Sequence, residues 1–89
     1  MSEDSEQLLE FPCEFPVKIM GRESPEFHTT VRSLVERHTG PLDESAIRST
    51  LSRNGRFVSI TITVSARSRE QLDAIYIDVS GHEDVLMAL

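Results

Sequence analysis

The residues best suited to recognise a ligand are a glycine, an arginine and a serine within the segment KIMGRESPEF, residues 18–27. Gly21 can let a ligand approach the backbone, Arg22 carries a positive charge, and Ser24 precedes Pro25 as the cap of a predicted helix. The free N–H groups and the positive dipole end of a helix start favour an anion. The segment therefore predicts either an anion-binding loop or a tight turn that joins a strand to a helix.

Catalytic and metal-binding patterns do not stand out in the sequence. Ser24, Ser68 and Asp73 have no spacing that identifies a catalytic triad, and helix capping explains both serines. The three histidines are scattered, without the i,i+4 pair or the suitably spaced carboxylates of a metal site. Cys13 is the only cysteine, and we expect it to pack as a small apolar side chain. We therefore expect a non-enzymatic protein with no catalytic residue, metal or cofactor.

Length and charge restrict the classes of function. The 89 residues, of which 38% are hydrophobic, are enough for one domain. The net charge is −6, and this balance argues against the broad basic surface of nucleic-acid binders. No apolar run approaches the ~20 residues of a membrane span, and no basic and apolar leader opens the chain. We expect a cytoplasmic protein with a flexible acidic arm, residues 1–8, and one domain, residues 9–89.

The first half of the chain predicts a strand followed by a helix. Apolar and polar residues alternate from Glu14 to Met20, which is typical of a half-buried strand. The Ser24-Pro25 pair starts a helix, and the segment HTGP, residues 38–41, ends it. Between these signals, one apolar stripe at helical spacing consists of Phe27, Val31, Leu34 and Val35.

In the second half of the chain, the sequence first predicts a β-hairpin. A strand that carries Ile47 and Leu51 on one face leads to Asn54-Gly55, a dipeptide typical of hairpin turns. Strict alternation then predicts a strand over residues 57–64. Its helix-facing side chains are expected to be Val58, Ile60, Ile62 and Val64.

A second helix and a last strand complete the predicted fold. Ser68 and Gln71 form a capping box that starts the helix, Gly81 ends it, and DVLMAL, residues 84–89, is the last strand. The order β-α-β-β-α-β predicts an α+β, ferredoxin-like fold. We expect a four-stranded antiparallel sheet of strand order 4-1-3-2, with both helices on one face.

Four segments together resemble the YbeD-like family of small bacterial proteins of unknown function. They are LLEFPCEFPVKIMG at residues 8–21, ERH at 36–38, VSITITVSA at 58–66 and EQLDAIY at 70–76. The resemblance implies a ferredoxin-like fold similar to ACT domains, which are regulatory modules that bind small molecules, usually at subunit interfaces. Members of the family often accompany an octanoyltransferase of lipoate synthesis, which implies a link to lipoate metabolism.

The predicted topology places several of the candidate residues at one end of the sheet. There the first strand runs into the first helix, the hairpin turns, and the second helix leads into the last strand. We call this the helix-start end. Its predicted ligand-binding residues are Gly21, Arg22, Ser24, Arg53, Arg56 and His82. The alternative contact surface is the other face of the sheet, with Phe57, Thr61 and Thr63.

Two other functions of this fold fit the sequence less well. An acylphosphatase needs a glycine-flanked loop that delivers an arginine to a phosphate, and MGRESPEF has only one glycine and a displaced arginine. An RNA-binding sheet needs several outward aromatic residues, and only Phe57 qualifies. We therefore predict an ACT-like regulatory module that binds a small metabolite or a partner protein and could form a homodimer. The alternative is a pure protein-interaction module without a ligand, and an acylphosphatase-like enzyme is a remote third.

Overall fold

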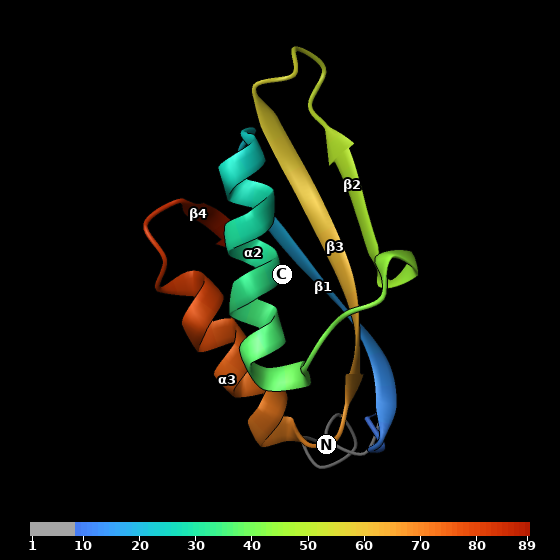
Figure 1. Cartoon of the computed structure of the whole chain (residues 1–89). Helices are drawn as coiled ribbons and strands as arrows, with labels where there is room; N and C mark the ends of the chain where they lie inside the picture. Colours follow the sequence, from blue (N-terminus) through green and yellow to red (C-terminus); the bar gives the residue numbers. More distant parts are fainter. Residues whose placement is uncertain (1–8) are drawn as a thin grey trace, which may run out of the picture.

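Helices and strands follow one another in the predicted order over residues 9–89, the part of the chain that this computed structural model describes (Figure 1). The predicted acidic arm, residues 1–8, lies outside the described residues. A short 3₁₀ helix, η1, precedes the second strand. The elements are β1 (Cys13–Arg22), α2 (Pro25–Thr39), η1 (Glu44–Ala46), β2 (Ile47–Leu51), β3 (Phe57–Ala66), α3 (Arg69–Ser80) and β4 (Val85–Ala88).

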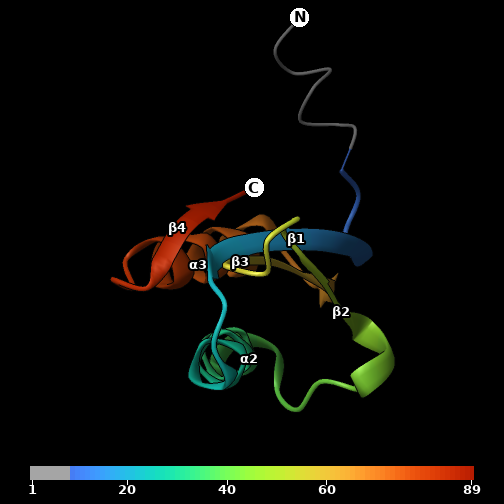
Figure 2. The same ribbon diagram turned by 90° about the horizontal axis from the view of Figure 1, so that it is seen from above.

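The strands form one antiparallel sheet in the order β2-β3-β1-β4, which confirms the predicted 4-1-3-2 order. The central pair, β1 and β3, stays in register from Cys13 opposite Ala66 to Arg22 opposite Phe57. The helices lie in front of the sheet in Figure 1, and the view from above in Figure 2 places α2 on one side of β1 and β3. We call the sheet face turned away from the helices the outer face.

The core lies between the helices and the sheet, on the side that the alternation predicts. In β3, Ile60 and Ile62 are only 2% and 0% exposed, whereas Thr61 between them is partly exposed. Cys13 is half-buried and packs against this core, as expected of a small apolar side chain. The buried stripes of the helices are Phe27, Val31, Leu34 and Val35 from α2, and Leu72, Ile75 and Val79 from α3.

The start of α3 is tied to the end of α2 through one glutamine. Ser68 caps α3 as predicted, because its Oγ accepts a hydrogen bond from the Gln71 N–H at 3.1 Å. The Gln71 side chain does not complete the predicted capping box. Its Oε1 accepts from the Arg67 N–H at 2.6 Å, and its Nε2 donates to the His38 carbonyl at 2.8 Å. The glutamine therefore joins the start of α3 to the end of α2.

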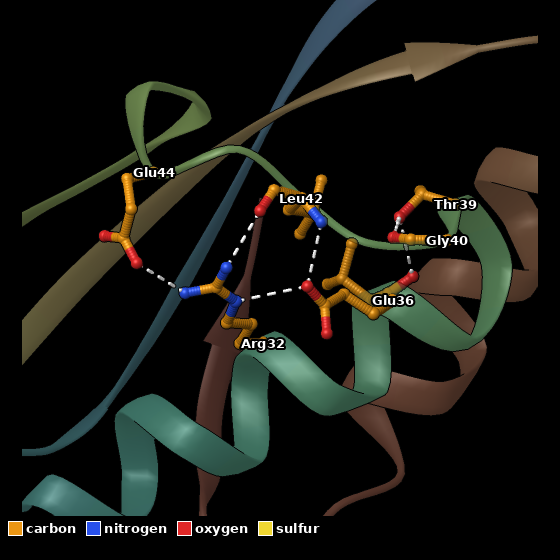
Figure 3. Close-up of polar contacts among 7 residues, drawn as sticks. Arg32, Glu36, Thr39, Gly40, Leu42 and Glu44 are labelled. Carbon is orange, nitrogen blue, oxygen red and sulfur yellow. Dashed lines mark hydrogen bonds and ion pairs between the residues drawn. The ribbon is translucent and has the colours of Figure 1, made fainter.

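The connection from α2 to β2 is held by an arginine and a glutamate on α2 (Figure 3). The Arg32 guanidinium donates to Glu44 at 2.9 Å, to Glu36 at 3.1 Å and to the Leu42 carbonyl at 2.8 Å. Glu36 also accepts the Leu42 N–H at 2.8 Å. This backbone hydrogen bond, and then the bond from Arg32, lower the pKa of Glu36 below its ordinary value. The network fixes residues 40–46 against α2.

The hairpin between β2 and β3 has the predicted glycine at its turn within a longer connection. Residues 52–56 join the two strands, and the Ser52 N–H donates to the Phe57 carbonyl at 2.8 Å to close them. Gly55 has φ 77°, a left-handed conformation that glycine adopts without strain. The Asn54-Gly55 signal therefore located the turn correctly.

Candidate functional site

The backbone segments predicted to meet at the helix-start end do meet there. The Glu23 N–H donates to the Arg56 carbonyl at 2.8 Å, which joins the turn between β1 and α2 to the hairpin. The loop before β4 also reaches this turn, because Glu83 and Asp84 line one pocket with Arg22 and Glu23. The topology alone was enough to predict this meeting, because it follows from the strand order.

Gly21 does not occupy an open loop, and the approach of a ligand to its backbone stays a prediction. The residue is buried within β1, beside a β-bulge in the pairing with β4, and its φ is not left-handed. A Cβ at this position would come within 2.7 Å of the Asp84 carbonyl oxygen and still closer to the Phe27 ring. Glycine is needed here because α2 and the loop before β4 pack directly against the strand.

A pocket of about 270 Å³ lies at this end, and its charge does not suit an anion. Arg22 is the only basic residue that lines it, and three acidic residues, Glu23, Glu83 and Asp84, line it as well. The helix start is also partly occupied, because Ser24 Oγ accepts the Phe27 N–H at 3.0 Å and Pro25 has no N–H to offer. The residues that line the pocket are Arg22, Glu23, Ser24, Phe27, Glu83, Asp84 and Leu86.

The predicted basic residues of this end do not converge on one point. The Arg22 guanidinium lies over the Phe57 ring, 5.4 Å from its centroid, on the outer face of the sheet. Arg53 and Arg56 are exposed on the hairpin, and neither lines the pocket. His82 accepts a hydrogen bond from its own loop. Of the predicted site, only Arg22 and Ser24 share the pocket.

The outer face carries a second group of basic and hydroxyl side chains. The strand register places Lys18 of β1 opposite Thr61 of β3, and Thr61 opposite Arg48 of β2. Lys18 and Arg48 are exposed, and neither is within ion-pair distance of a carboxylate in residues 9–89. A shallow hollow of about 570 Å³ separates them, lined by Lys18, Arg48, Ser49, Thr50, Ser59 and Thr61.

Ser59 adds an unusual polar atom to this face. Within residues 9–89 its Oγ is the one buried side-chain oxygen or nitrogen that has no hydrogen-bond partner. A buried hydroxyl without a partner costs free energy that a new hydrogen bond would recover. Lys18 lies on this face because the side chains of β1 alternate and those of Val17 and Ile19 are buried on the helix side. The position of Arg48 beside it was missed, because the register of β2 on β3 is set by the hairpin and leaves no signal in β2 itself.

A metal-binding cluster and a membrane-spanning helix are both absent from the part of the chain that the structure describes. Between residues 9 and 89, no group of three or more histidine, cysteine or acidic side chains is placed to hold a metal ion. In the same part of the chain, no helix has the length and apolar character needed to cross a membrane.

Comparison with known proteins places the chain in a family. The family described as "Protein of unknown function (DUF493)" matches residues 6–89. The chain belongs to this family. Within DUF493, the chain is 46% identical to a UPF0250 protein of Chromobacterium violaceum and 44% identical to one of Paraburkholderia phytofirmans, each over 100% of both chains. The YbeD-like resemblance is therefore confirmed.

A solved structure supports the fold independently. The solution structure of protein HP0495 from H. pylori matches this DUF493 chain with a TM-score of 0.71 and 17% sequence identity. The match covers 91% of this chain and 85% of the other chain. At this identity the likeness supports the arrangement of helices and strands alone.

Proposed function

We propose that this DUF493 chain is a non-catalytic, ACT-like binding module that recognises a partner protein through the outer face of its sheet. The observation that carries the proposal is the row of Lys18, Thr61 and Arg48 on a face that neither helix covers. Within residues 9–89, these two bases have no carboxylate within ion-pair distance. Exposed positive charges beside hydroxyl groups are suited to a partner surface of opposite charge.

The shape of this face favours a protein over a small molecule. Small-molecule sites are usually enclosed and largely apolar, with a few polar groups that fix the ligand. The hollow between Lys18 and Arg48 is shallow and is lined by charged and hydroxyl side chains. The resemblance to a family linked with lipoate synthesis makes enzymes of that pathway the first partners to test, with a regulatory role for the module.

Charge reversal on the outer face tests this proposal. Immobilised protein is incubated with an extract of its native cells, and the retained proteins of wild type, Lys18→Glu and Arg48→Glu are compared. The matched control is Arg69→Glu, an exposed arginine at the start of α3. We expect one partner that wild type and the control retain and both reversals lose. A partner retained equally by all four proteins would contradict the proposal.

A second candidate function is favoured by the charges of the pocket at the helix-start end. Arg22 could hold a carboxylate there, while Glu83 and Asp84 could hold an ammonium group. This arrangement supports binding of a small zwitterion, such as a free amino acid, in keeping with the ACT-like resemblance. A thermal-unfolding screen of amino acids tests it, because a ligand at 100 times its Kd stabilises by about 2.7 kcal/mol. No shift in wild type, or an equal shift in Asp84→Asn, would exclude the pocket.

A further inference from the structure

Among residues 9–89, one side of β2 has no partner strand and is open to pair with another. The Ser52 N–H bonds to the Phe57 carbonyl, and hydrogen-bonded pairs alternate along an antiparallel ladder. Arg48 and Thr50 therefore direct their backbone groups toward β3, whereas Ser49 and Leu51 direct theirs away from the sheet. Figure 1 shows β2 at the border of the sheet, away from both helices. An edge strand of this kind is a template for one more strand.

The helix-facing side of β2 is incompletely covered. Leu51 is 57% exposed although it lies opposite the buried Val58, and Ile47 is only half-buried. A pocket of about 210 Å³ opens between α2 and β2, and core side chains form part of its wall. Its lining residues are His28, Thr29, Arg32, Glu44, Ile47, Ile60 and Ile62. An apolar side chain entering beside β2 would cover this exposed surface.

The outer side of the same strand has the opposite character. Arg48 and Thr50 are exposed there, and Arg48 has no carboxylate within ion-pair distance in residues 9–89. A strand added beside β2 would place one residue directly opposite Arg48, where an acidic side chain forms a favourable cross-strand pair. Because side chains alternate between the two faces, one added strand can meet both requirements.

We infer that an extended segment of a partner protein, with alternating apolar and acidic residues, adds to β2 as a fifth strand of the sheet. This inference rests on the proposed partner-binding function and names the chemistry of the partner. Backbone hydrogen bonds to Ser49 and Leu51 supply the pairing. The apolar residues face α2 near Ile47, and an acidic residue faces Arg48.

Two terminally blocked seven-residue peptides are suitable probes for the full chain. One alternates valine and glutamate, and the other alternates valine and lysine. We expect the glutamate peptide to slow hydrogen exchange of the Ser49 and Leu51 amides, which point away from β3. The Thr50 amide is the internal reference, because it is already bonded within the sheet. The lysine peptide should bind about five- to tenfold more weakly. Unchanged exchange at Ser49 and Leu51 with millimolar glutamate peptide would overturn the inference.

Variants of β2 separate backbone pairing from side-chain charge. Ser49→Pro removes an outward N–H without breaking a bond to β3, so it should abolish peptide binding and leave the fold intact. Ser49→Thr, which keeps the N–H, is the matched control. Arg48→Glu should reverse the preference between the two peptides. Equal binding by Ser49→Pro and Ser49→Thr would overturn the inference.

The same variants distinguish this inference from the proposed function. A native partner that is lost by Lys18→Glu but retained by Ser49→Pro would lie on the outer face without extending the sheet, so only the inference would fail. A partner insensitive to both changes would contradict both proposals.

Sedimentation of the protein alone tests whether a second copy of the chain occupies the edge of β2. A dimer that Ser49→Pro dissociates would assign the edge to self-association and overturn the partner inference.

Discussion

At the scale of single residues, Gly21 illustrates how close packing can require a position without a side chain. The Phe27 ring and the Asp84 carbonyl occupy the space that a side chain would need. We therefore expect Gly21→Ala to cost about 1–3 kcal/mol, the usual effect of overpacking a close contact. Urea unfolding measures the loss. The same substitution should cost less in a Phe27→Leu background, where the ring is removed. A loss below about 0.5 kcal/mol would show that the contact relaxes freely.

The two faces of β3 give a second residue-scale prediction. Ile62 is fully buried against the helices, whereas Thr61 points to the outer face. Ile62→Ala should lower the free energy of unfolding by about 2–5 kcal/mol, because it leaves a cavity in the core. Thr61→Ala should change it by about 0.5 kcal/mol or less. Equal losses in urea melts would contradict the assignment of the faces.

These two predictions differ in whether the sequence around the residue contains the information behind them. The faces of β3 follow from a strict alternation of apolar residues, which is a local signal and was read correctly. The role of Gly21 depends on a phenylalanine ring in the first turn of α2 and on a carbonyl more than 60 residues later in the chain. No pattern around the glycine contains that information, so the sequence indicated only that a side chain is missing there.

At the scale of elements, the α2–β2 connection makes stability depend on pH. The Leu42 N–H and then Arg32 lower the pKa of Glu36 from its ordinary value of 4.5, so the folded state prefers the carboxylate. This contribution is present above about pH 4.5 and is lost as the pH falls through the lowered pKa.

Glu36→Gln tests this contribution through thermal midpoints measured at a series of pH values from neutral to acidic. The variant should melt below wild type at pH 6 to 7, and the difference should shrink toward pH 3 as Glu36 becomes protonated. Asp73→Asn, on an exposed position of α3, is the control and should show a small difference at every pH. If the difference in thermal midpoint between Glu36→Gln and wild type did not change with pH, the shape of the Glu36 side chain and not its charge would account for its role.

Element starts and ends were predictable to different degrees. Both serine caps and the glycine of the hairpin are local signals, and the structure has them where expected. The Arg32 network joins residues up to 12 positions apart through one side chain, and the Gln71 bond to His38 spans 33 positions. Such bonds appear only when the chain has folded. The sequence showed where the helices begin, but not the side-chain hydrogen bonds that join the helix ends to their neighbours.

At the scale of the whole molecule, the strand order was predictable and the binding surface was not. Right-handed crossovers and the β-α-β-β-α-β order leave few arrangements, which is why the 4-1-3-2 sheet could be derived. The same derivation identified the residues of the helix-start end but not their side-chain directions. The Arg22 guanidinium lies over the Phe57 ring, and Glu83 and Asp84 line the pocket. Charge at a site is set by such directions, which strand order does not determine.

The strand order also interleaves the two halves of the chain. β1 lies between β3 and β4, so neither β1 and β2 nor β3 and β4 are neighbours. A chain cut between Asn54 and Gly55 would yield two fragments that each lack any pair of adjacent strands. We expect each fragment alone to be unfolded by circular dichroism, and an equimolar mixture to regain the signal of the intact protein at a rate that rises with concentration. The domain would thus behave as an obligate heterodimer of its own halves, suited to a split reporter whose signal requires both.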